Sequence, residues 1–223
     1  MRWIDLGNPI PRAKIESHEP VEWPGGDEFC LPSDTAEPNT TFIDVIRSRR
    51  SKRTYAAPTI EQLARLLALT CRIRAPVVSV AGLHQSTRPA PSAGALHPIH
   101  VILHRRDEER WRRYDPYRHS LVDLPSKNAP STVRESLEEV LVGGQATLML
   151  FAAEPQLTFA KYEQACSLIW RDAGVLQGIF SLAAEALGFH WCVLGVTGEP
   201  WVSGLVQQHA LVGVGAAYVG APG

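Results

Sequence analysis

Hydrophobic positions recur every three or four residues in four stretches of this chain, and each such stretch predicts a helix. The first begins after Thr41, whose hydroxyl can cap it, and the second begins after Thr59, which opens a capping-box pattern. A short amphipathic helix is predicted over 131–141. The longest helix is expected from about 159 to 187, because Gly188 stands in the usual glycine stop position.

Short apolar runs bounded by Gly, Pro or polar clusters predict strands. The clearest is 147–153, which is apolar almost throughout and is expected to be a buried strand. Residues 75–96 are rich in Pro, Ser, Gly and Ala and are expected to be mainly loop. Helices that cover a small sheet of this kind give an α+β fold. The other strand candidates are 99–103, a Tyr-rich hairpin over 111–124, 191–195 and 211–218.

Residues 1–40 differ in composition from the rest of the chain. Six of the 17 prolines lie there, and proline removes a backbone donor and disfavours helix at the preceding residue. The segment is therefore predicted to be an extended arm, and residues 41–223 form the main domain. The apolar side chains of the arm are expected to pack on its own domain or on a second subunit: Trp3, Ile4, Trp23 and Phe29.

Composition restricts the class of protein. Lys and Arg number 22 against 23 Asp and Glu, whereas a protein that binds mainly phosphate backbones is clearly basic, so nucleic-acid binding is not expected. The longest apolar run, 140–153, is too short to span a membrane, and no membrane partner is expected. The N-terminus does not resemble a secretory signal. Four well-separated cysteines are typical of reduced thiols in a cytoplasmic protein.

A run of five cations in seven residues, 47–53, lies at the end of the first predicted helix. Such charges repel one another unless an anion or several carboxylates lie nearby. Three interpretations are open: a solvated helix end, a nucleic-acid patch, and a cradle for a phosphate-bearing ligand. The cradle is chemically sound because guanidinium groups match the geometry of phosphate and a Ser hydroxyl adds a donor.

Two further segments carry candidate chemistry. The small residues of 89–98 let backbone groups approach a flat ligand closely, and the segment lacks the nucleophile motif of a serine hydrolase. Lys161 and Tyr162 are both competent proton donors if they are held beside a substrate. A metal site is a further possibility at the segment that contains His97 and His100. On a strand these two side chains point to opposite faces, so no metal site is expected.

Taken in order along the chain, these segments resemble the nitroreductase family of FMN-dependent oxidoreductases. The family's helix-end signature is matched by Arg49-Arg50-Ser51-Lys52-Arg53-Thr54-Tyr55. The branch called SagB-type, or thiazole/oxazole dehydrogenases, is resembled by Pro91–Pro98, by Asp172–Gln177 leading into Ala186–Gly188, and by Cys192–Gly195. The resemblance covers residues 42–220. It implies an α+β fold with a small mixed sheet between helices, built as an intertwined homodimer.

The resemblance also implies that FMN binds at the subunit interface. Arg49, Arg50 and Ser51 would hold the phosphate and ribityl chain of FMN, and Arg53 would approach the N1/C2-carbonyl side of the flavin ring. A cation suits that position because two-electron reduction leaves negative charge at N1. The family's further cation near the C-terminus is absent, since no Lys follows Lys161 and no Arg follows Arg171. The implied FMN-binding residues are Arg49, Arg50, Ser51, Arg53, Pro91, Ser92, Ala93, Gly94, Leu194 and Gly195.

In the azoline dehydrogenases of this branch a Lys-Tyr pair acts in catalysis, and Lys161-Tyr162 is the matching pair. The implied reaction is the oxidation of an azoline or related ring, in a small molecule or a modified peptide, by hydride transfer to flavin. Two alternatives stay open: an NAD(P)H-dependent reductase of nitro compounds or quinones, and a degenerate flavin-binding partner subunit without turnover. A cyclodehydratase-type partner that presents the peptide is also left open.

Overall fold

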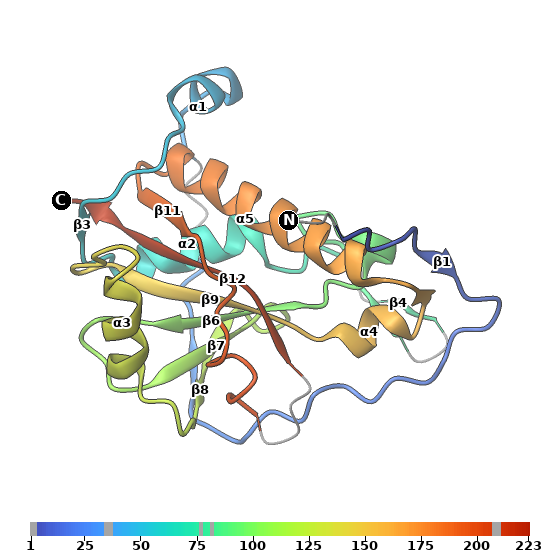
Figure 1. Ribbon diagram of the computed structural model, residues 1–223. Helices are drawn as coiled ribbons and strands as arrows, with labels where there is room; N and C mark the ends of the chain where they lie inside the picture. Colours follow the sequence, from blue (N-terminus) through green and yellow to red (C-terminus); the bar gives the residue numbers. More distant parts are fainter. Residues whose placement is uncertain (1–3, 34–37, 76–77, 81–82, 207–210) are drawn as a thin grey trace.

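An eight-stranded β-sheet forms the centre of the fold, and helices lie on both of its faces (Figure 1). The computed structural model describes residues 4–33, 38–75, 78–80, 83–206 and 211–223. In chain order the elements are β1 (Ile10–Pro11), β2 (Glu28–Cys30), α1 (Phe42–Ser48), β3 (Tyr55–Ala56), α2 (Ile60–Thr70), β4 (Val78–Val80), β5 (Leu83–Gln85), a 3-10 turn η1 (Ala93–Ala95), β6 (Ile99–His104), β7 (Trp111–Asp115), β8 (Ser120–Leu124), α3 (Pro130–Glu138), β9 (Thr147–Ala153), α4 (Pro155–Phe159), β10 (Tyr162–Glu163), α5 (Cys166–Ala186), β11 (His190–Leu194) and β12 (Val212–Pro222).

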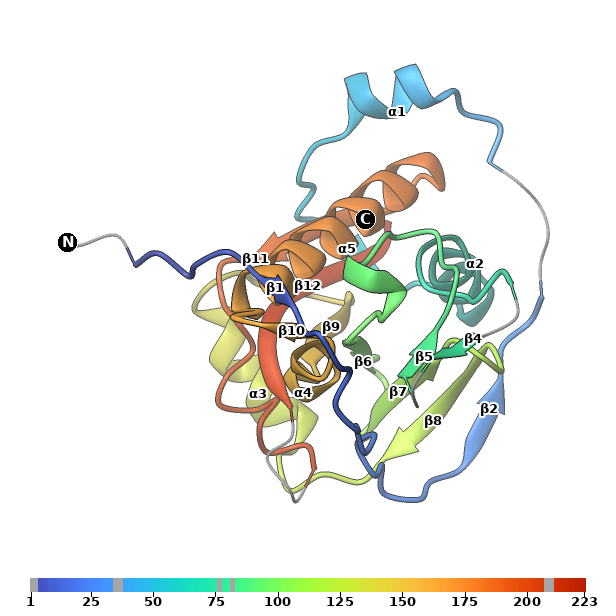
Figure 2. The same cartoon turned by 90° about the vertical axis from the view of Figure 1, so that its right-hand side faces the viewer.

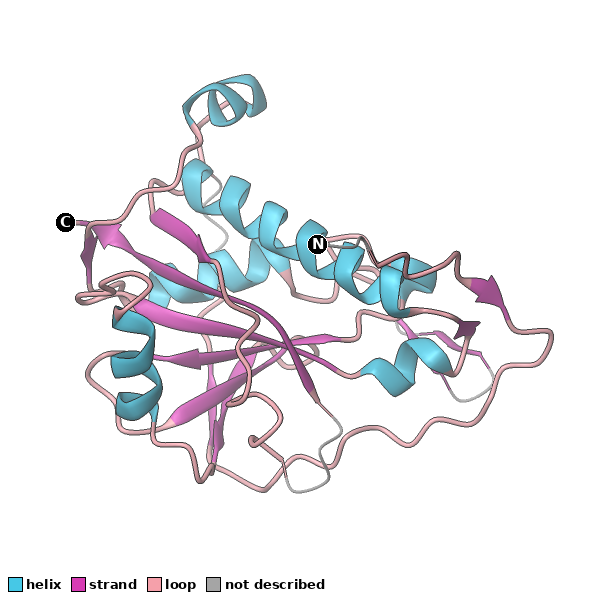
Figure 3. Ribbon diagram, viewed as in Figure 1, coloured by secondary structure: helices cyan, strands magenta, loops and turns pink. Residues whose placement is uncertain are grey.

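The strand order of the sheet is β11-β12-β9-β6-β7-β8-β2, with β3 paired to the end of β12. Strand β9 lies between β6 and β12 and is buried at every position, which confirms the predicted buried strand (Figure 3). The α+β fold class is confirmed as well. One detail differs: every pairing between described strands is antiparallel, whereas the resemblance implied a mixed sheet. The alternation of side chains identifies the faces of a strand but not its direction.

Two apolar layers hold the helices on the sheet. Helices α2 and α5 pack on one face, and α3 packs on the other together with the segment 201–206. On the first face the rings of Phe180 and Trp191 stack 5.2 Å apart, and Phe151 of β9 meets the Phe180 ring edge-on. Such aromatic contacts add to the free energy of burial, so they fix α5 firmly above the sheet.

The helix starts agree with the capping chemistry of the sequence. The Thr41 hydroxyl accepts a hydrogen bond from the backbone N–H of Asp44 at 3.2 Å. At the start of α2, Thr59 and Gln62 form both hydrogen bonds of a capping box. These local contacts satisfy backbone donors that a helix start otherwise leaves unpaired. The predicted starts of α1 and α2 are therefore confirmed.

The single long helix predicted over 159–187 is wrong in its first part. The chain there forms α4, then the two-residue strand β10, and only then α5 from Cys166. Gln164 adopts a positive φ of 52°, which breaks the helix, and β10 pairs with β1 of the arm. This pairing joins residues about 150 positions apart in the chain, so the local pattern does not reveal it. The predicted stop is confirmed, because Gly188 has a φ of 74°.

Residues 75–96 contain more structure than the sequence indicates. Strands β4 and β5 pair with each other as a small two-stranded sheet, and η1 follows before β6. Each of these elements is only three residues long, which is too short to give a periodic pattern.

The N-terminal arm runs along the domain. It pairs with β10 through β1 and with β8 through β2. Between these strands, the backbone N–H of Val21 donates to Glu154 at 2.8 Å. Trp3 lies outside the described residues, and Ile4 is 76% exposed.

Helix α1 stands beyond the C-terminal end of α5, away from the sheet (Figures 1 and 2). Only Val45 of this helix is buried, while Phe42, Ile43 and Ile46 are at least half exposed. An apolar face of this kind is unusual for a helix that has only water beside it. Among the described helices, none has the length and apolar character needed to cross a bilayer.

Candidate active site

The turn η1 is held against α5 by one buried carboxylate. Asp172 accepts hydrogen bonds from the Ser92 hydroxyl at 2.5 Å and from the backbone N–H of Ala93 at 3.1 Å. The Ser92 hydroxyl in turn accepts from the backbone N–H of His97 at 2.9 Å. Burial raises the pKa of Asp172 above its ordinary value, although the two donors act against it. The contacts fix the small-residue loop on the first half of α5, while Pro91 stays exposed at its start.

The same turn brings Gly94 against Lys161 and Tyr162. The Lys161 ammonium donates to the Gly94 carbonyl at 3.4 Å and lies 5.8 Å from the centre of the Tyr162 ring. Gly94 has a φ of 63°, and a Cβ built there would lie 2.8 Å from Lys161 Nζ and 2.9 Å from Tyr162 Oη. A residue without a side chain is therefore required. The structure thus brings together two parts of the predicted site that are 67 positions apart.

Strand β10 explains how the Lys-Tyr pair reaches this turn. The backbone N–H of Arg12 donates to the Lys161 carbonyl at 3.0 Å, and Pro11 pairs with Tyr162. The Tyr162 ring packs on a small apolar cluster that includes Leu96. Both side chains of the pair are partly exposed, so a ligand can reach them.

The predicted phosphate-binding residues lie at the other end of α5. Lys52 is paired with Glu185 at 2.8 Å. Burial tends to raise the pKa of Glu185, but Lys52 and Ser48 outweigh it, and the pKa lies below its ordinary value. Arg49, Arg50 and Arg53 are exposed and form no ion pair within 4.0 Å among the described residues, although the charge of Arg50 also helps to lower the pKa of Glu185. Ser51 is exposed beside them.

An open hollow of about 520 Å³ adjoins Arg49. Arg49 lines it together with Gly174, Gly178 and Val193. A Cβ built on either glycine would meet no atom within 4 Å, so the middle of α5 offers a flat, uncovered surface. Of the predicted ring contacts, Leu194 is buried in the sheet and Gly195 is exposed.

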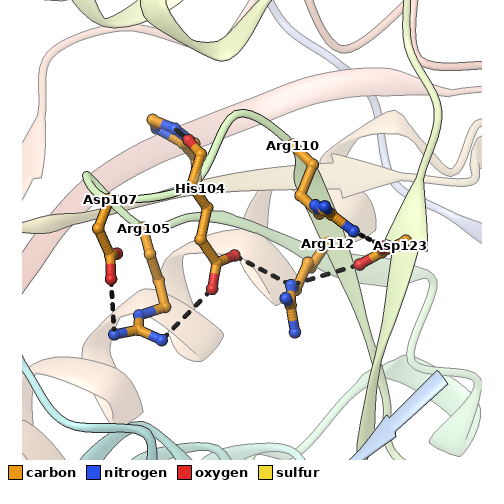
Figure 4. Close-up of polar contacts among 7 residues, drawn as sticks. His104, Arg105, Asp107, Arg110, Arg112 and Asp123 are labelled. Carbon is orange, nitrogen blue, oxygen red and sulfur yellow. Dashed lines mark hydrogen bonds and ion pairs between the residues drawn. The ribbon is translucent and has the colours of Figure 1, made fainter. Parts of the chain in front are cut away.

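In a second arginine-rich segment, 105–113, the arginines are paired with carboxylates of the same chain (Figure 4). Arg105 pairs with Asp107 and Glu108, Arg112 pairs with Glu108 and Asp123, and Arg110 pairs with Asp123. These cations are neutralised within the chain. The unpaired arginines at 49, 50 and 53 are therefore the better candidates for binding an external anion.

Within one chain the two groups of predicted residues do not meet. Ser92 and Ala93 are bound at Asp172, whereas Lys52 is bound at Glu185. These two positions are thirteen residues apart on one helix, which corresponds to about 20 Å at 1.5 Å per residue. Arg49 lies between the two ends, because it lines the same hollow as Gly174 and Gly178, and no contact between described residues joins the arginines to the Lys-Tyr pair.

Sequence reasoning did not assign roles to the two acids that organise the site. Asp172 and Glu185 are the only two acids in the 21 residues of α5, and a buried carboxylate normally has hydrogen-bond partners. This isolated placement is the signal that marks them. Their partners lie 80 and 133 positions earlier in the chain and cannot be read from it.

The histidines of the 97–104 segment have separate partners. Nε2 of His97 is 2.8 Å from the Ser86 carbonyl, that of His100 is 3.0 Å from Glu154, and that of His104 is 2.7 Å from the Glu108 carbonyl. Burial lowers the pKa of His97 and of His104 to about 4, so both are neutral at pH 7. Among the described residues, no group of three or more His, Cys, Asp or Glu side chains could hold a metal ion.

The protein family of the chain is identified by a match to a family model. The model described as "Nitroreductase family" matches residues 46–209, which is most of the chain and spans both groups of site residues. The chain belongs to the nitroreductase family. No curated protein matches this nitroreductase-family chain.

Solved structures share the fold of this nitroreductase-family chain. A crystal structure of a candidate nitroreductase from Ralstonia eutropha JMP134 superposes with a TM-score of 0.69 at 17% identity, covering 93% of this chain and 97% of that one. A chain of the E. coli microcin synthetase McbBCD complex, with truncated pro-MccB17 bound, gives 0.60 at 18% identity, covering 86% and 76%. A candidate nitroreductase from Desulfovibrio desulfuricans in complex with FMN gives 0.51 at 17% identity, covering 82% and 87%.

Proposed function

We propose that this nitroreductase-family chain is an FMN-dependent oxidoreductase whose cofactor binds between two copies of the chain. The observation that carries the proposal is the group of exposed guanidinium ions at Arg49, Arg50 and Arg53, of which Arg49 lines an open hollow on α5. The arginines of 105–113, in contrast, are paired with carboxylates. The family membership and the FMN complex of the Desulfovibrio protein support the same choice of ligand.

The residues fit the parts of FMN. The guanidinium groups and the Ser51 hydroxyl offer charge-assisted donors for a phosphate. The exposed backbone at Gly195 offers close approach for a flat ring, because a Cβ there would meet no atom within 4 Å. At Gly94 the space beside the backbone is taken by the ends of Lys161 and Tyr162, so the turn places these two side chains beside a ligand. When bound, FMN supplies an acceptor for a hydride. A guanidinium such as that of Arg53 would stabilise the negative charge that reduction leaves on the ring.

A second copy of the chain would complete the site. Asp172, which holds the turn of Gly94, and Glu185, which holds Lys52, are about 20 Å apart along α5, so the two groups are anchored at separate ends of this helix. The uncovered apolar side chains of α1 and α5 include Phe42, Ile46 and Trp170, each at least 47% exposed. Burying them against a partner would stabilise a homodimer. Light scattering should give a mass of twice 24.5 kDa, and a monomer at micromolar concentration would refute the dimer.

The Lys-Tyr pair favours oxidation of an azoline or related ring, in a small molecule or a modified peptide. Such an oxidation removes a hydride and a proton from the ring. Lys161 and Tyr162 lie together at the Gly94 turn and can hold or move that proton at Nζ and Oη. The microcin synthetase complex supports a peptide presented by a cyclodehydratase-type partner. This substrate class is a more specific proposal than the binding of FMN.

One comparison of variants separates this reading from an NAD(P)H-dependent reductase. Lys161→Met and Tyr162→Phe should retain FMN but lose at least 100-fold in oxidation of a thiazoline substrate, since general acid–base groups contribute on that scale. Their rate of NAD(P)H-driven quinone reduction should change little. Wild-type chain that reduces quinones with NAD(P)H but never oxidises a thiazoline would assign it to the reductases. Chain that binds FMN without any turnover would be a flavin-binding partner subunit.

A further inference from the structure

A second cavity, separate from the hollow on α5, lies where the N-terminal arm crosses β6 and β7. In Figure 2 the arm (blue) passes in front of this end of the sheet. The cavity measures about 240 Å³, and most of its walls are apolar, with Val21, Leu96, Ile99 and Leu157 among them. A concave, mostly apolar space with a few polar groups is the usual form of a small-molecule site.

The arm wall of this cavity is tied in place by one buried acid. Glu154 accepts from the backbone N–H of Val21 at 2.8 Å, and its two oxygens lie 2.9 Å from His18 Nε2 and 3.0 Å from His100 Nε2. The Trp23 ring meets His100 edge-on at 4.9 Å. These contacts fix the wall in one position, so the cavity is formed before any ligand arrives.

Arg88 lines the cavity and brings a positive charge that no carboxylate of the described residues contacts within 4.0 Å. It is partly buried, and burial lowers the pKa of its guanidinium, which nevertheless stays charged. Its Nε donates to the Ser86 hydroxyl at 3.0 Å. No carboxylate among the described residues forms an ion pair with it. A guanidinium removed from water is costly unless an anion pairs with it.

The acids that lie nearest are already engaged. Glu154 is held by the arm and His100, as described above. Asp115 accepts from the backbone N–H of Tyr117 at 2.8 Å, faces Arg113 at 3.9 Å, and acts on Arg88 only from a distance, by tending to raise the pKa of its guanidinium. Asp172, which lines a water-sized cavity beside Arg88, is bound by Ser92 and Ala93. None of these acids forms an ion pair with Arg88, so its guanidinium is open to direct pairing with a ligand from solution.

We propose that this cavity binds a compact carboxylate with a flat apolar body, anchored by the guanidinium of Arg88. A carboxylate matches the two-pronged geometry of guanidinium better than a neutral group does. A cavity of about 150 Å³ accepts benzene, so 240 Å³ has room for a six-membered ring and one carboxylate. Trp23 and Ile99 supply apolar surface for the ring.

The inference does not rest on the proposed cofactor chemistry. The cavity lies behind the turn that carries Gly94, and Leu96 separates the two, because it lines the cavity and packs against Tyr162. Binding can therefore be measured without flavin or turnover.

The test is a ligand-observed NMR titration of the full chain with benzoate, and with benzamide as the neutral analogue of the same shape. Wild-type chain should bind benzoate saturably and at least tenfold more tightly than benzamide. Arg88→Met should weaken benzoate binding at least tenfold. Arg88→Lys should weaken it less, because lysine keeps the positive charge but lacks the two-pronged geometry of the guanidinium group. The matched control Arg110→Met, at the exposed end of β7, should bind as wild type does.

Three results would overturn the proposal. They are no saturable benzoate binding to wild-type chain, equal affinity for benzoate and benzamide, and equal benzoate affinity in wild type and in folded Arg88→Met. The benzamide comparison uses wild-type chain, so the proposal stays testable even if Arg88→Met does not fold. Inorganic phosphate binding in place of benzoate would also contradict it, since it would assign the cavity to a different anion.

Discussion

Removal of the Asp172 carboxylate is the perturbation that tests how the site is assembled. This one side chain holds the loop of η1 through the Ser92 hydroxyl and the Ala93 N–H. Asp172→Ala deletes both contacts and leaves the Ser92 O–H and the Ala93 N–H without an acceptor in a partly buried place. It should therefore loosen the turn that sets Gly94 against the Lys-Tyr pair.

The magnitude follows from the two hydrogen bonds. A hydrogen bond to a charged group contributes about 1.5–3 kcal/mol, and two would give about 3–6 kcal/mol. The raised pKa of Asp172 means that burial of the charge offsets part of this gain. We therefore expect a loss of about 3 kcal/mol in the free energy of unfolding. For a chain of this length that corresponds to a fall in Tm of about 6–12 °C.

The assay is urea denaturation of wild type and variant at one fixed protein concentration, so that self-association affects both equally. Ser92→Ala should cost less, about 1–2 kcal/mol, because the Ala93 contact remains. The matched control is Asp107→Ala, whose carboxylate is 67% exposed in the network of Figure 4 and should change stability by less than about 0.5 kcal/mol. An Asp172→Ala variant as stable as that control would refute this account of the turn.

Three further predictions concern the turn, the arm and the arginines. Gly94→Ala should cost about 1–2 kcal/mol of stability, by denaturation, because its φ is positive, and it should slow substrate oxidation by displacing Lys161 and Tyr162. Burial tends to raise the pKa of Glu154, but its hydrogen bonds outweigh burial and hold that pKa below its ordinary value, so its contribution is fully present above about pH 4.3 and is lost at lower pH, as the pH falls through the depressed pKa of the folded state. Hydrogen exchange at the Val21 amide, corrected for intrinsic rates, should show protection at pH 7 that fades only below about pH 4.3, and Glu154→Gln should remove this pH dependence. Arg49→Ala should weaken FMN binding by about 1.5–3 kcal/mol in a flavin-fluorescence titration, and unchanged affinity would remove Arg49 from the site.

The parts of the fold that the sequence predicts well are those determined by neighbours in the chain. The caps at Thr41 and Thr59 and the stop at Gly188 depend on contacts within a few residues. The division of the predicted 159–187 helix depends on β1, about 150 positions away, and therefore could not be anticipated.

In the candidate site, too, the sequence reveals the features that neighbouring residues determine and not those that depend on distant ones. The basic run at 47–53 and the small residues around Gly94 are visible as composition, and the family resemblance supplied their order. The link between Asp172 and Ser92 spans 80 positions and appears only in the fold. The same is true of Arg88, whose lack of a direct ion-pair partner is a property of its surroundings and not of its sequence neighbours.

The most direct measurement for the central proposal is the visible absorption spectrum of the full chain after incubation with FMN and removal of the unbound cofactor. The account predicts an oxidised-flavin spectrum, one FMN released per chain on denaturation, and loss of this flavin when Arg49, Arg50 and Arg53 are replaced together by Met. A colourless wild-type chain that takes up no FMN would contradict the proposal, and the unpaired arginines would then require another anion.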